Sequence, residues 1–297
     1  MKNNKNILII SPFFYPEPIS TGKFNTDFAV ALKNDGHNVT MLCYHPFYPD
    51  WKIKESREEL NGITIIRGGK YLAFSKKTIV RRIILEISFA FFILRKIRKH
   101  QKNKDIIIPV FPPSFAFYSI LPFLNKKIKK VGMVHDLQEV YSIDKGGFIN
   151  KNIRFFIHKI ERKCYRSCTK LVFLSKEMKE QAKELYTLQE IKLEVQYPFI
   201  TIKDKLTNDL EHLFDKDKKH VVYSGALGEK QNPERLFDFF DQASVSTKNI
   251  IFHFFSRGDT FNKLKKMNTN SRIHFHGLVE KEHLEELYHK SDVQIIP

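Results

Sequence analysis

Cysteine is scarce in this sequence, with 3 residues among 297. A low and odd number of cysteines excludes a framework of disulfide bonds and is typical of proteins from a reducing compartment. Cys164 and Cys168 lie four residues apart in a predicted helix, so they share one face of it. No second Cys/His pair with zinc-site spacing accompanies them, and we expect both side chains to pack inside the protein.

Long apolar runs are also missing. The longest, over residues 83–94, is interrupted by Glu86 and is shorter than the roughly 20 residues that span a bilayer. The basic, polar N-terminus is followed by an apolar run, residues 7–10, that is too short for the central region of a signal peptide. We therefore expect no transmembrane helix and a cytoplasmic protein.

Acidic residues are too few to balance the basic ones. Asp and Glu number 33 against 50 Lys and Arg, which gives a formal net charge of +17. Such an excess attracts anions, including nucleotide phosphates, nucleic acid and anionic lipids, although a lysine-rich composition alone also produces it. Because no nucleic-acid recognition module is present, we expect no nucleic-acid partner.

Apolar, strand-like segments alternate with amphipathic helical segments along the chain. Repeated strand–helix units predict an α/β fold in which helices cover both faces of parallel sheets. The pattern restarts after a polar stretch, so we expect two Rossmann-like domains, over 1–200 and 219–297, joined by a linker over 201–218. Expected strands cover residues 7–10, 39–43, 63–66, 105–110, 130–135, 171–174, 192–196, 221–224, 250–255, 273–276 and 292–296. Expected helices cover residues 24–34, 78–99, 114–124, 151–167, 176–185, 232–243, 260–267 and 281–289.

The loop between the first strand and the first helix is a candidate ligand site. Gly22 allows close approach of the backbone, and the helix N-terminus behind Thr21 and Gly22 favours anions. The first glycine of a P-loop is absent and Phe24 follows Lys23, so this is neither a P-loop nor a GxGxxG motif. An ordinary strand-to-helix turn remains the alternative.

The loop that opens the second domain carries a stronger signal. Gly225 and Gly228 permit close backbone contact with phosphate, and Lys230 supplies a cation to a diphosphate. Pro233 suits the first turn of the following helix, whose N-terminus adds partial positive charge. Together these features predict a diphosphate cradle, with an exposed lysine on a turn as the alternative.

The motif over residues 224–231, Ser-Gly-x-x-Gly-x-Lys-Gln, resembles the retaining glycosyltransferases of family 4, which have the GT-B fold. The segments 11–17, 21–23 and 47–51 are similar to the same family. The closest likeness is to bacterial transferases that build colanic-acid-type exopolysaccharide and O-antigen, and it covers essentially the whole chain. The resemblance implies a GT-B fold whose second Rossmann-like domain is incomplete here.

The resemblance also assigns roles to residues. Thr21 and Gly22 would approach the donor from the first domain, while Gly225 and Lys230 would hold its diphosphate. The family often has an arginine where this chain has Ala226, so one cation is absent or comes from elsewhere.

Two further strand ends complete the expected site. His135 and Asp136 would contact the sugar or the acceptor, which makes them the catalytic candidates, although His135 can equally be a strand-end cap. Gly258 would shape the nucleotide pocket, and we expect Arg257 to lie on the surface. His274 and His276 alternate on a strand, and since no third ligand is evident we interpret them as sheet residues, with no metal and no cofactor required.

The main departure from the family lies at the end of the sequence. The family's pair of glutamates, eight positions apart, normally follows the strand that corresponds to 292–296, and this sequence stops before it. We interpret the chain as truncated. A catalytically inactive sugar-nucleotide-binding or accessory protein is therefore the alternative to an enzyme.

The expected activity is transfer of a hexose-type sugar from a nucleoside-diphosphate donor to a saccharide in bacterial surface polysaccharide biosynthesis, such as that of capsule or lipopolysaccharide. Retention of configuration follows from the resemblance alone. The acceptor is expected to be lipid-linked, because the basic amphipathic helix 78–99 can rest on an anionic membrane at its inner face. A core helix with solvated charged ends is the alternative for 78–99, and a sugar-nucleotide epimerase is a rival activity.

Overall fold

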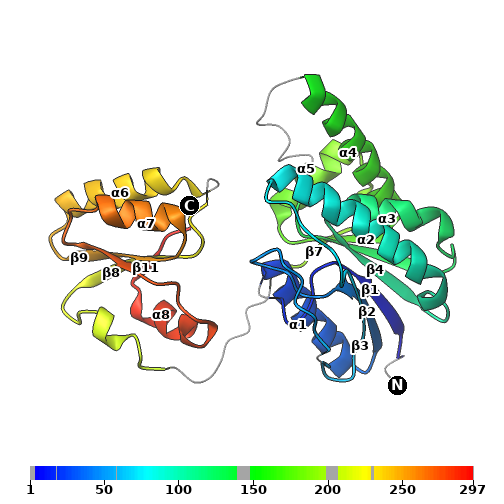
Figure 1. The fold of residues 1–297 in the computed structure, drawn as a ribbon, viewed down its shortest axis with the longest axis horizontal. Helices are drawn as coiled ribbons and strands as arrows, with labels where there is room; N and C mark the ends of the chain where they lie inside the picture. Colours follow the sequence, from blue (N-terminus) through cyan, green and yellow to red (C-terminus); the bar gives the residue numbers. More distant parts are fainter. Residues whose placement is uncertain are drawn as a thin grey trace. The chain divides into compact units, whose positions relative to one another are not determined.

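The chain forms two compact units, Met1–Phe199 (unit 1) and Ile200–Pro297 (unit 2). In this computed structural model, each unit is a parallel β-sheet covered by helices (Figure 1). The α/β class and the parallel sheets expected from the sequence are thereby confirmed. The structure describes residues 4–17, 19–57, 59–138, 148–198, 207–228 and 231–296.

Unit 1 contains a seven-stranded sheet with the order β3-β2-β1-β4-β5-β6-β7. The order reverses between β1 and β4, which pair in parallel with Ile9 opposite Ile108. Doubly wound sheets bind ligands at the carboxyl ends of the strands beside such a reversal. The strands are β1 (Asn6–Ile10), β2 (Asn38–Tyr44), β3 (Thr64–Gly68), β4 (Ile106–Phe111), β5 (Lys129–Val134), β6 (Lys170–Phe173) and β7 (Leu193–Val195).

The central strand β1 is apolar throughout because both faces of the sheet are covered. Ile7 and Ile9 face the layer that contains α1, whereas Leu8 and Ile10 face the layer built from α2, α3, α4 and α5 (Figure 1). Cys164 and Cys168 are both buried in that second layer, as expected. The helices of unit 1 are α1 (Ser20–Asn34), α2 (Thr78–His100), α3 (Ser114–Ile120), α4 (Phe148–Ser167) and α5 (Lys176–Tyr186), with short 3₁₀ helices at Leu121–Phe123 and Glu190–Lys192.

Unit 2 contains a four-stranded sheet with the order β10-β9-β8-β11. Helices α6 and α7 cover one face of it, and α8 together with the segment around Phe214 covers the other. That segment, within the linker expected over 201–218, is tied to α8 because Glu286 accepts hydrogen bonds from the backbone N–H groups of Asp209 and Leu210. The strands are β8 (Lys219–Ser224), β9 (Ile250–Phe255), β10 (Ile273–His276) and β11 (Val293–Gln294). The helices are α6 (Pro233–Ser246), α7 (Asp259–Met267) and α8 (Leu284–Lys290), with 3₁₀ turns at Glu211–Leu213 and Lys281–His283.

Helix boundaries differ from the expected ones in two instructive places. Helix α1 begins at Ser20, four residues before the expected start at Phe24, so Thr21 and Gly22 lie inside its first turn. The helix expected over 114–124 ends at Ile120 and continues as a 3₁₀ turn, because Pro122 has no N–H to donate to the carbonyl of Tyr118. Among the described residues, no helix has the length and apolarity needed to cross a membrane.

Candidate functional site

The loop that follows β1 is held against α1 by a buried asparagine. Asn25 is fully buried, and its Nδ2 donates to Ser11 Oγ and to the carbonyl of Phe13, each at 3.0 Å. This side chain therefore fixes the start of α1 to the carboxyl end of β1. Its Oδ1 is buried without a hydrogen-bond partner within the described part of the chain. The sequence motif points to this loop but does not reveal Asn25.

A buried glutamate joins two of the motifs that the sequence singled out. The carboxylate of Glu17 accepts hydrogen bonds from the backbone N–H groups of Phe47, at 3.1 Å, and Tyr48, at 2.7 Å. Burial raises the pKa of Glu17, and these N–H groups and the charge of Arg67 oppose the rise. The loops over 11–17 and 45–51 consequently form one structure beside the start of α1.

Gly22 is required because this loop crosses α1 at close range. A Cβ atom added at Gly22 would lie 2.9 Å from Cβ of Glu17 and 3.1 Å from its carbonyl oxygen. The first turn of α1 also contains no acidic residue, and Ile19 at the N-cap offers no side-chain acceptor. First-turn N–H groups have no partner within their own helix, so those of Thr21 and Gly22 are suited to bind an anion.

The structure brings the start of α1 next to the end of β5. The ring of Phe24 meets the ring of His135 edge-on, with the centroids 5.0 Å apart. The backbone N–H of His135 donates to the carbonyl of Phe111 at 2.9 Å, which places His135 at the carboxyl ends of β4 and β5. Thr21, Gly22 and His135 thus belong to one region of unit 1.

His135 presents a neutral imidazole. Burial lowers its pKa to about 4, and its Nε2 is buried without a hydrogen-bond partner within the described residues. An unpaired buried ring nitrogen is costly. The neighbouring Asp136 accepts from the backbone N–H of Leu137 at 3.0 Å through its Oδ1. The catalytic role of both residues stays a prediction.

Two carboxylates behind this region escaped the sequence-based prediction. Gln138 donates through Nε2 to Glu86 at 2.9 Å and through its backbone N–H to Glu161 at 3.3 Å. Glu86 also accepts from the N–H groups of Phe115 and Ala116 in the first turn of α3. Burial raises the pKa of Glu86 to about 7. The visible signal is that Glu86 interrupts an apolar run.

Glu161 is fully buried and is surrounded by hydroxyl donors. Its carboxylate accepts from the hydroxyls of Tyr165 and Tyr186 and from Ser114 Oγ. Both carboxylates thereby fix the loop that follows Asp136, since each is bonded to Gln138. They act on the candidate site by positioning this loop.

In unit 2, hydrogen bonds join the segments that follow the carboxyl ends of β8 and β9. Ser256 Oγ donates to the carbonyl of Gly225 at 2.6 Å, and the N–H of Gly225 donates to the carbonyl of Phe255 at 3.1 Å. Gly258 follows two residues later as the N-cap of α7, with φ 105°, a conformation that favours glycine. The structure therefore brings Gly225 and Gly258 to the same end of the sheet.

In the described part of the predicted diphosphate loop, Gly228 and Gln231 are bonded to each other just before α6. The N–H of Gly228 donates to Oε1 of Gln231 at 3.1 Å, and the N–H of Gln231 donates to the carbonyl of Gly228 at 3.0 Å. Pro233 occupies the first turn of α6, as expected. Lys230, the predicted phosphate-binding cation, lies outside the described residues.

Comparisons with known proteins identify the family. The model of Glycosyltransferase Family 4 matches residues 21–204, which is more than half of the chain. A curated relative, described as the colanic acid biosynthesis glycosyl transferase WcaI of Escherichia coli (strain K12), is 25% identical over 290 residues. The match covers 88% of this chain and 68% of WcaI.

Solved structures share the fold at low sequence identity. Sucrose-phosphate synthase from Thermosynechococcus elongatus superposes with a TM-score of 0.71 at 15% identity, over 99% of this chain and 75% of that one. The catalytic domain of starch synthase IV from Arabidopsis thaliana, bound to ADP and acarbose, gives 0.66 at 11% identity, over 99% and 78%. A glycosyltransferase from Rickettsia africae gives 0.62 at 16% identity, over 98% and 72%. These likenesses confirm the GT-B fold, and identities this low say nothing further about activity.

Proposed function

Because this chain belongs to glycosyltransferase family 4, we propose that it transfers a sugar from a nucleoside-diphosphate donor to a saccharide acceptor in the biosynthesis of a bacterial surface polysaccharide. The observation that carries this proposal is the lock between Gly225 and Ser256, which sets two glycine-bearing strand ends side by side in unit 2. The relative WcaI, named for colanic acid biosynthesis, supports the polysaccharide product.

The chemical task of unit 2 is to hold a diphosphate that departs with negative charge. Gly225 and Gly258 have no side chain to keep a phosphate away from the backbone. The N-terminus of α6 directs free N–H groups and partial positive charge toward an anion. Lys230 adds a full charge. Donors of this kind, fixed before the reaction, lower the barrier because they match the charge that develops on the leaving group.

The substrate-contacting residues that we propose in unit 1 are those that the family resemblance singles out. Thr21 and Gly22 would approach the donor with the first-turn N–H groups of α1, and His135 contributes a neutral imidazole that can hydrogen-bond to a sugar hydroxyl. Asp136 is the second catalytic candidate. Transfer of a hexosyl group with retention of configuration is part of the proposal and rests on family resemblance.

We place the acceptor on a lipid because α2 exposes an apolar stripe. Val80, Ile83, Ile87 and Phe91 are 41%, 51%, 45% and 61% exposed, and their spacing sets them on one face of the helix. The opposite face is buried in the core of unit 1. Exposed basic residues lie at both ends of the stripe, as on helices that rest on anionic membranes. Peripheral contact with the inner face of the plasma membrane is therefore proposed.

A transfer assay tests the enzymatic part. The protein is incubated with UDP-, GDP- and ADP-sugars and a bacterial lipid-linked oligosaccharide fraction, and products are identified by mass spectrometry. We expect one donor to give a product extended by one sugar. His135→Ala is expected to lower the rate about 100-fold, within the range for a residue that exchanges a proton or hydrogen bond with the reacting group. The control His37→Ala lies at the opposite, amino-terminal end of β2 and should keep the rate.

Other outcomes of this assay favour the rivals. Conversion of the sugar nucleotide without any acceptor would support an epimerase and contradict transfer. Nucleotide binding without product from any donor would support the sugar-nucleotide-binding alternative.

Vesicle flotation tests the membrane contact. We expect the protein to float with vesicles containing phosphatidylglycerol and to remain below with pure phosphatidylcholine. Ile87→Ser together with Phe91→Ser should abolish flotation, whereas Phe239→Ser, which changes an equally exposed aromatic residue of unit 2, should not. Flotation that is unchanged by the double substitution would refute the assignment of the membrane face to α2.

A further inference from the structure

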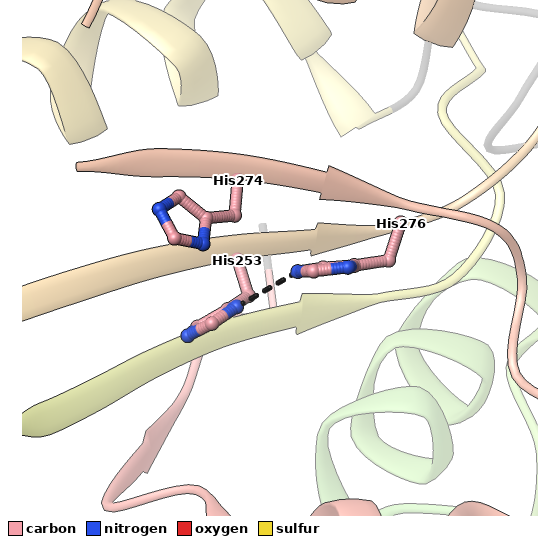
Figure 2. Close-up of side chains that lie close together, drawn as sticks. All are labelled: His253, His274 and His276. Carbon is pink, nitrogen blue, oxygen red and sulfur yellow. Dashed lines mark hydrogen bonds between the residues drawn. The ribbon is translucent and has the colours of Figure 1, made fainter. Parts of the chain in front are cut away.

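Histidines from two neighbouring strands meet on one face of the unit 2 sheet (Figure 2). His253 on β9 lies directly opposite His274 on β10 in the parallel register. His276 follows His274 by two residues, so it lies on the same face of the strand. One ring nitrogen from each of these three histidines lies within 4.8 Å of the other two.

We propose that His253, His274 and His276 bind a divalent transition-metal ion such as Zn²⁺. Three imidazoles on rigid strands form a common protein ligand set for zinc that leaves one coordination position for water or another ligand. The sequence alone indicates His274 and His276 but no third ligand. The pairing of β9 with β10 supplies it.

The tautomer of His253 is fixed so that a lone pair faces the other two rings. The carbonyl oxygen of Asp215 can only accept, so Nε2 of His220, at 2.8 Å, carries the proton there. In the neutral tautomer that this bond selects, Nδ1 of His220 accepts from Nε2–H of His253, at 2.9 Å. Nδ1 of neutral His253 is left as the acceptor, and it lies 3.0 Å from Nε2 of His276.

His274 is oriented in the same way. Its Nε2 lies 3.0 Å from the carbonyl oxygen of Ser271, which again can only accept. Nε2 therefore carries the proton, and the lone pair is on Nδ1. Histidines that ligate metals almost always donate their second ring N–H to a carbonyl or another acceptor, which sets ring orientation and ligand basicity. Both His253 and His274 already make such a bond.

The spacing of the nitrogens is close to what zinc requires. With Zn–N bonds of about 2.0–2.1 Å, tetrahedral geometry separates two ligand nitrogens by about 3.3 Å. The distance between Nδ1 of His253 and Nε2 of His276, 3.0 Å, needs to increase by only a few tenths of an ångström. Nε2 of His276 must also give up its proton, so His276 adopts the tautomer that is protonated on Nδ1. His274 is half-buried, and its ring has to shift to bring Nδ1 to the ion, which loosens its bond to the carbonyl of Ser271.

The chemistry of the cluster favours borderline metals over hard ones. Imidazole nitrogen suits zinc, copper, nickel and cobalt, while magnesium and calcium prefer oxygen ligands. The charge of Lys265 acts on His276 and weakens the binding of any cation.

This site adjoins the proposed donor loop without depending on it. The backbone N–H of Ser256 donates to the carbonyl of His276 at 3.2 Å, and Ser256 also holds Gly225. An ion bound by the cluster would therefore stiffen this end of the sheet. The proposal concerns metal binding alone and stands whether or not nucleotides bind.

The test is a metal titration of tag-free protein that has been treated with a chelator and desalted. Co²⁺ is added while the visible absorption bands of tetrahedral cobalt are recorded, and Zn²⁺ is then used as competitor. We expect one ion per chain, displacement by Zn²⁺ and no effect of Mg²⁺. His274→Ala and His276→Gln, which change half-buried side chains, should each weaken binding about tenfold or more, because one of three protein ligands is lost.

The controls separate the cluster from adventitious binding. His289→Ala removes an exposed histidine of α8 and should leave the affinity within about twofold of wild type. Lys265→Gln should tighten binding, because a repelling charge is removed. Circular dichroism establishes that each variant is folded. Absence of the cobalt bands, or equal affinity in wild type, His274→Ala and His276→Gln, would overturn the proposal.

Discussion

Glu86→Gln is expected to stabilise unit 1 at alkaline pH and to change little at pH 5. Burial raises the pKa of Glu86 from 4.5 to about 7 in the folded protein. A carboxyl group with a raised pKa stabilises the fold when it is protonated. Its contribution is complete below the unfolded pKa and is lost as the pH rises through about 7.

The size of the effect follows from the shift. One unit of pKa difference corresponds to about 1.4 kcal/mol, so ionised Glu86 costs unit 1 about 3 kcal/mol once the pH exceeds 7. Most of this loss falls between pH 5 and pH 8. The side-chain oxygen of the new glutamine can still accept from the N–H groups of Phe115 and Ala116. Its NH₂ group can donate to Gln138 if the side-chain amide of Gln138 flips to present its oxygen. Between pH 5 and pH 8 we therefore expect the free energy of unfolding to fall by about 2 kcal/mol less in Glu86→Gln than in wild type.

The assay is urea unfolding at pH 5 and pH 8, followed by tryptophan fluorescence. Trp51 is the single tryptophan of the chain and packs against Phe47 and Phe74, so its signal reports on unit 1. Glu184→Gln, at an exposed position on α5, is the matched control and should behave as wild type. Equal loss of stability between the two pH values in wild type and Glu86→Gln would refute this reasoning.

Three further substitutions test the loops of the candidate site. Gly22→Ala places a methyl group 2.9 Å from Cβ of Glu17 and should destabilise unit 1 by about 1–3 kcal/mol, measured by Trp51 fluorescence; an unchanged unfolding midpoint would contradict the close crossing. Gly258→Ala meets no atom within 4 Å but adopts φ 105°, so strain of about 1–3 kcal/mol should speed hydrogen exchange at the start of α7, and unaltered exchange would argue against this backbone conformation. Ser256→Ala removes the bond to the carbonyl of Gly225, worth about 1 kcal/mol, and should weaken nucleotide binding several-fold in calorimetry; wild-type affinity would show that the lock does not matter.

The strands could be predicted because strands buried on both faces appear in the sequence as continuous apolar runs. β1 and β4 are covered on both faces and read as continuous apolar runs, and all the strands expected from such runs are present in the described chain. Helix boundaries were less accurate, since α1 begins without a side-chain cap and nothing in its sequence marks Ser20.

The long-range partners could not be predicted. Glu17 accepts hydrogen bonds from backbone N–H groups about thirty residues away. Every residue except proline has a backbone N–H, so the residue types at these positions do not indicate the contact. The histidine cluster depends on the parallel register of β9 and β10, and periodicity within one strand does not set that register. Asn25 and Glu161 act through contacts that only the fold creates.

Isothermal titration calorimetry with UDP, GDP and ADP tests most directly that this chain binds a nucleoside diphosphate through the loop after β8. Wild type is compared with Lys230→Ala and with Lys248→Ala, which removes the same charge at the opposite, amino-terminal end of β9. We predict micromolar binding of one nucleotide, weakened about tenfold or more by Lys230→Ala and unchanged by Lys248→Ala. Absence of binding to all three nucleotides, or equal affinity for Lys230→Ala and wild type, would contradict this prediction.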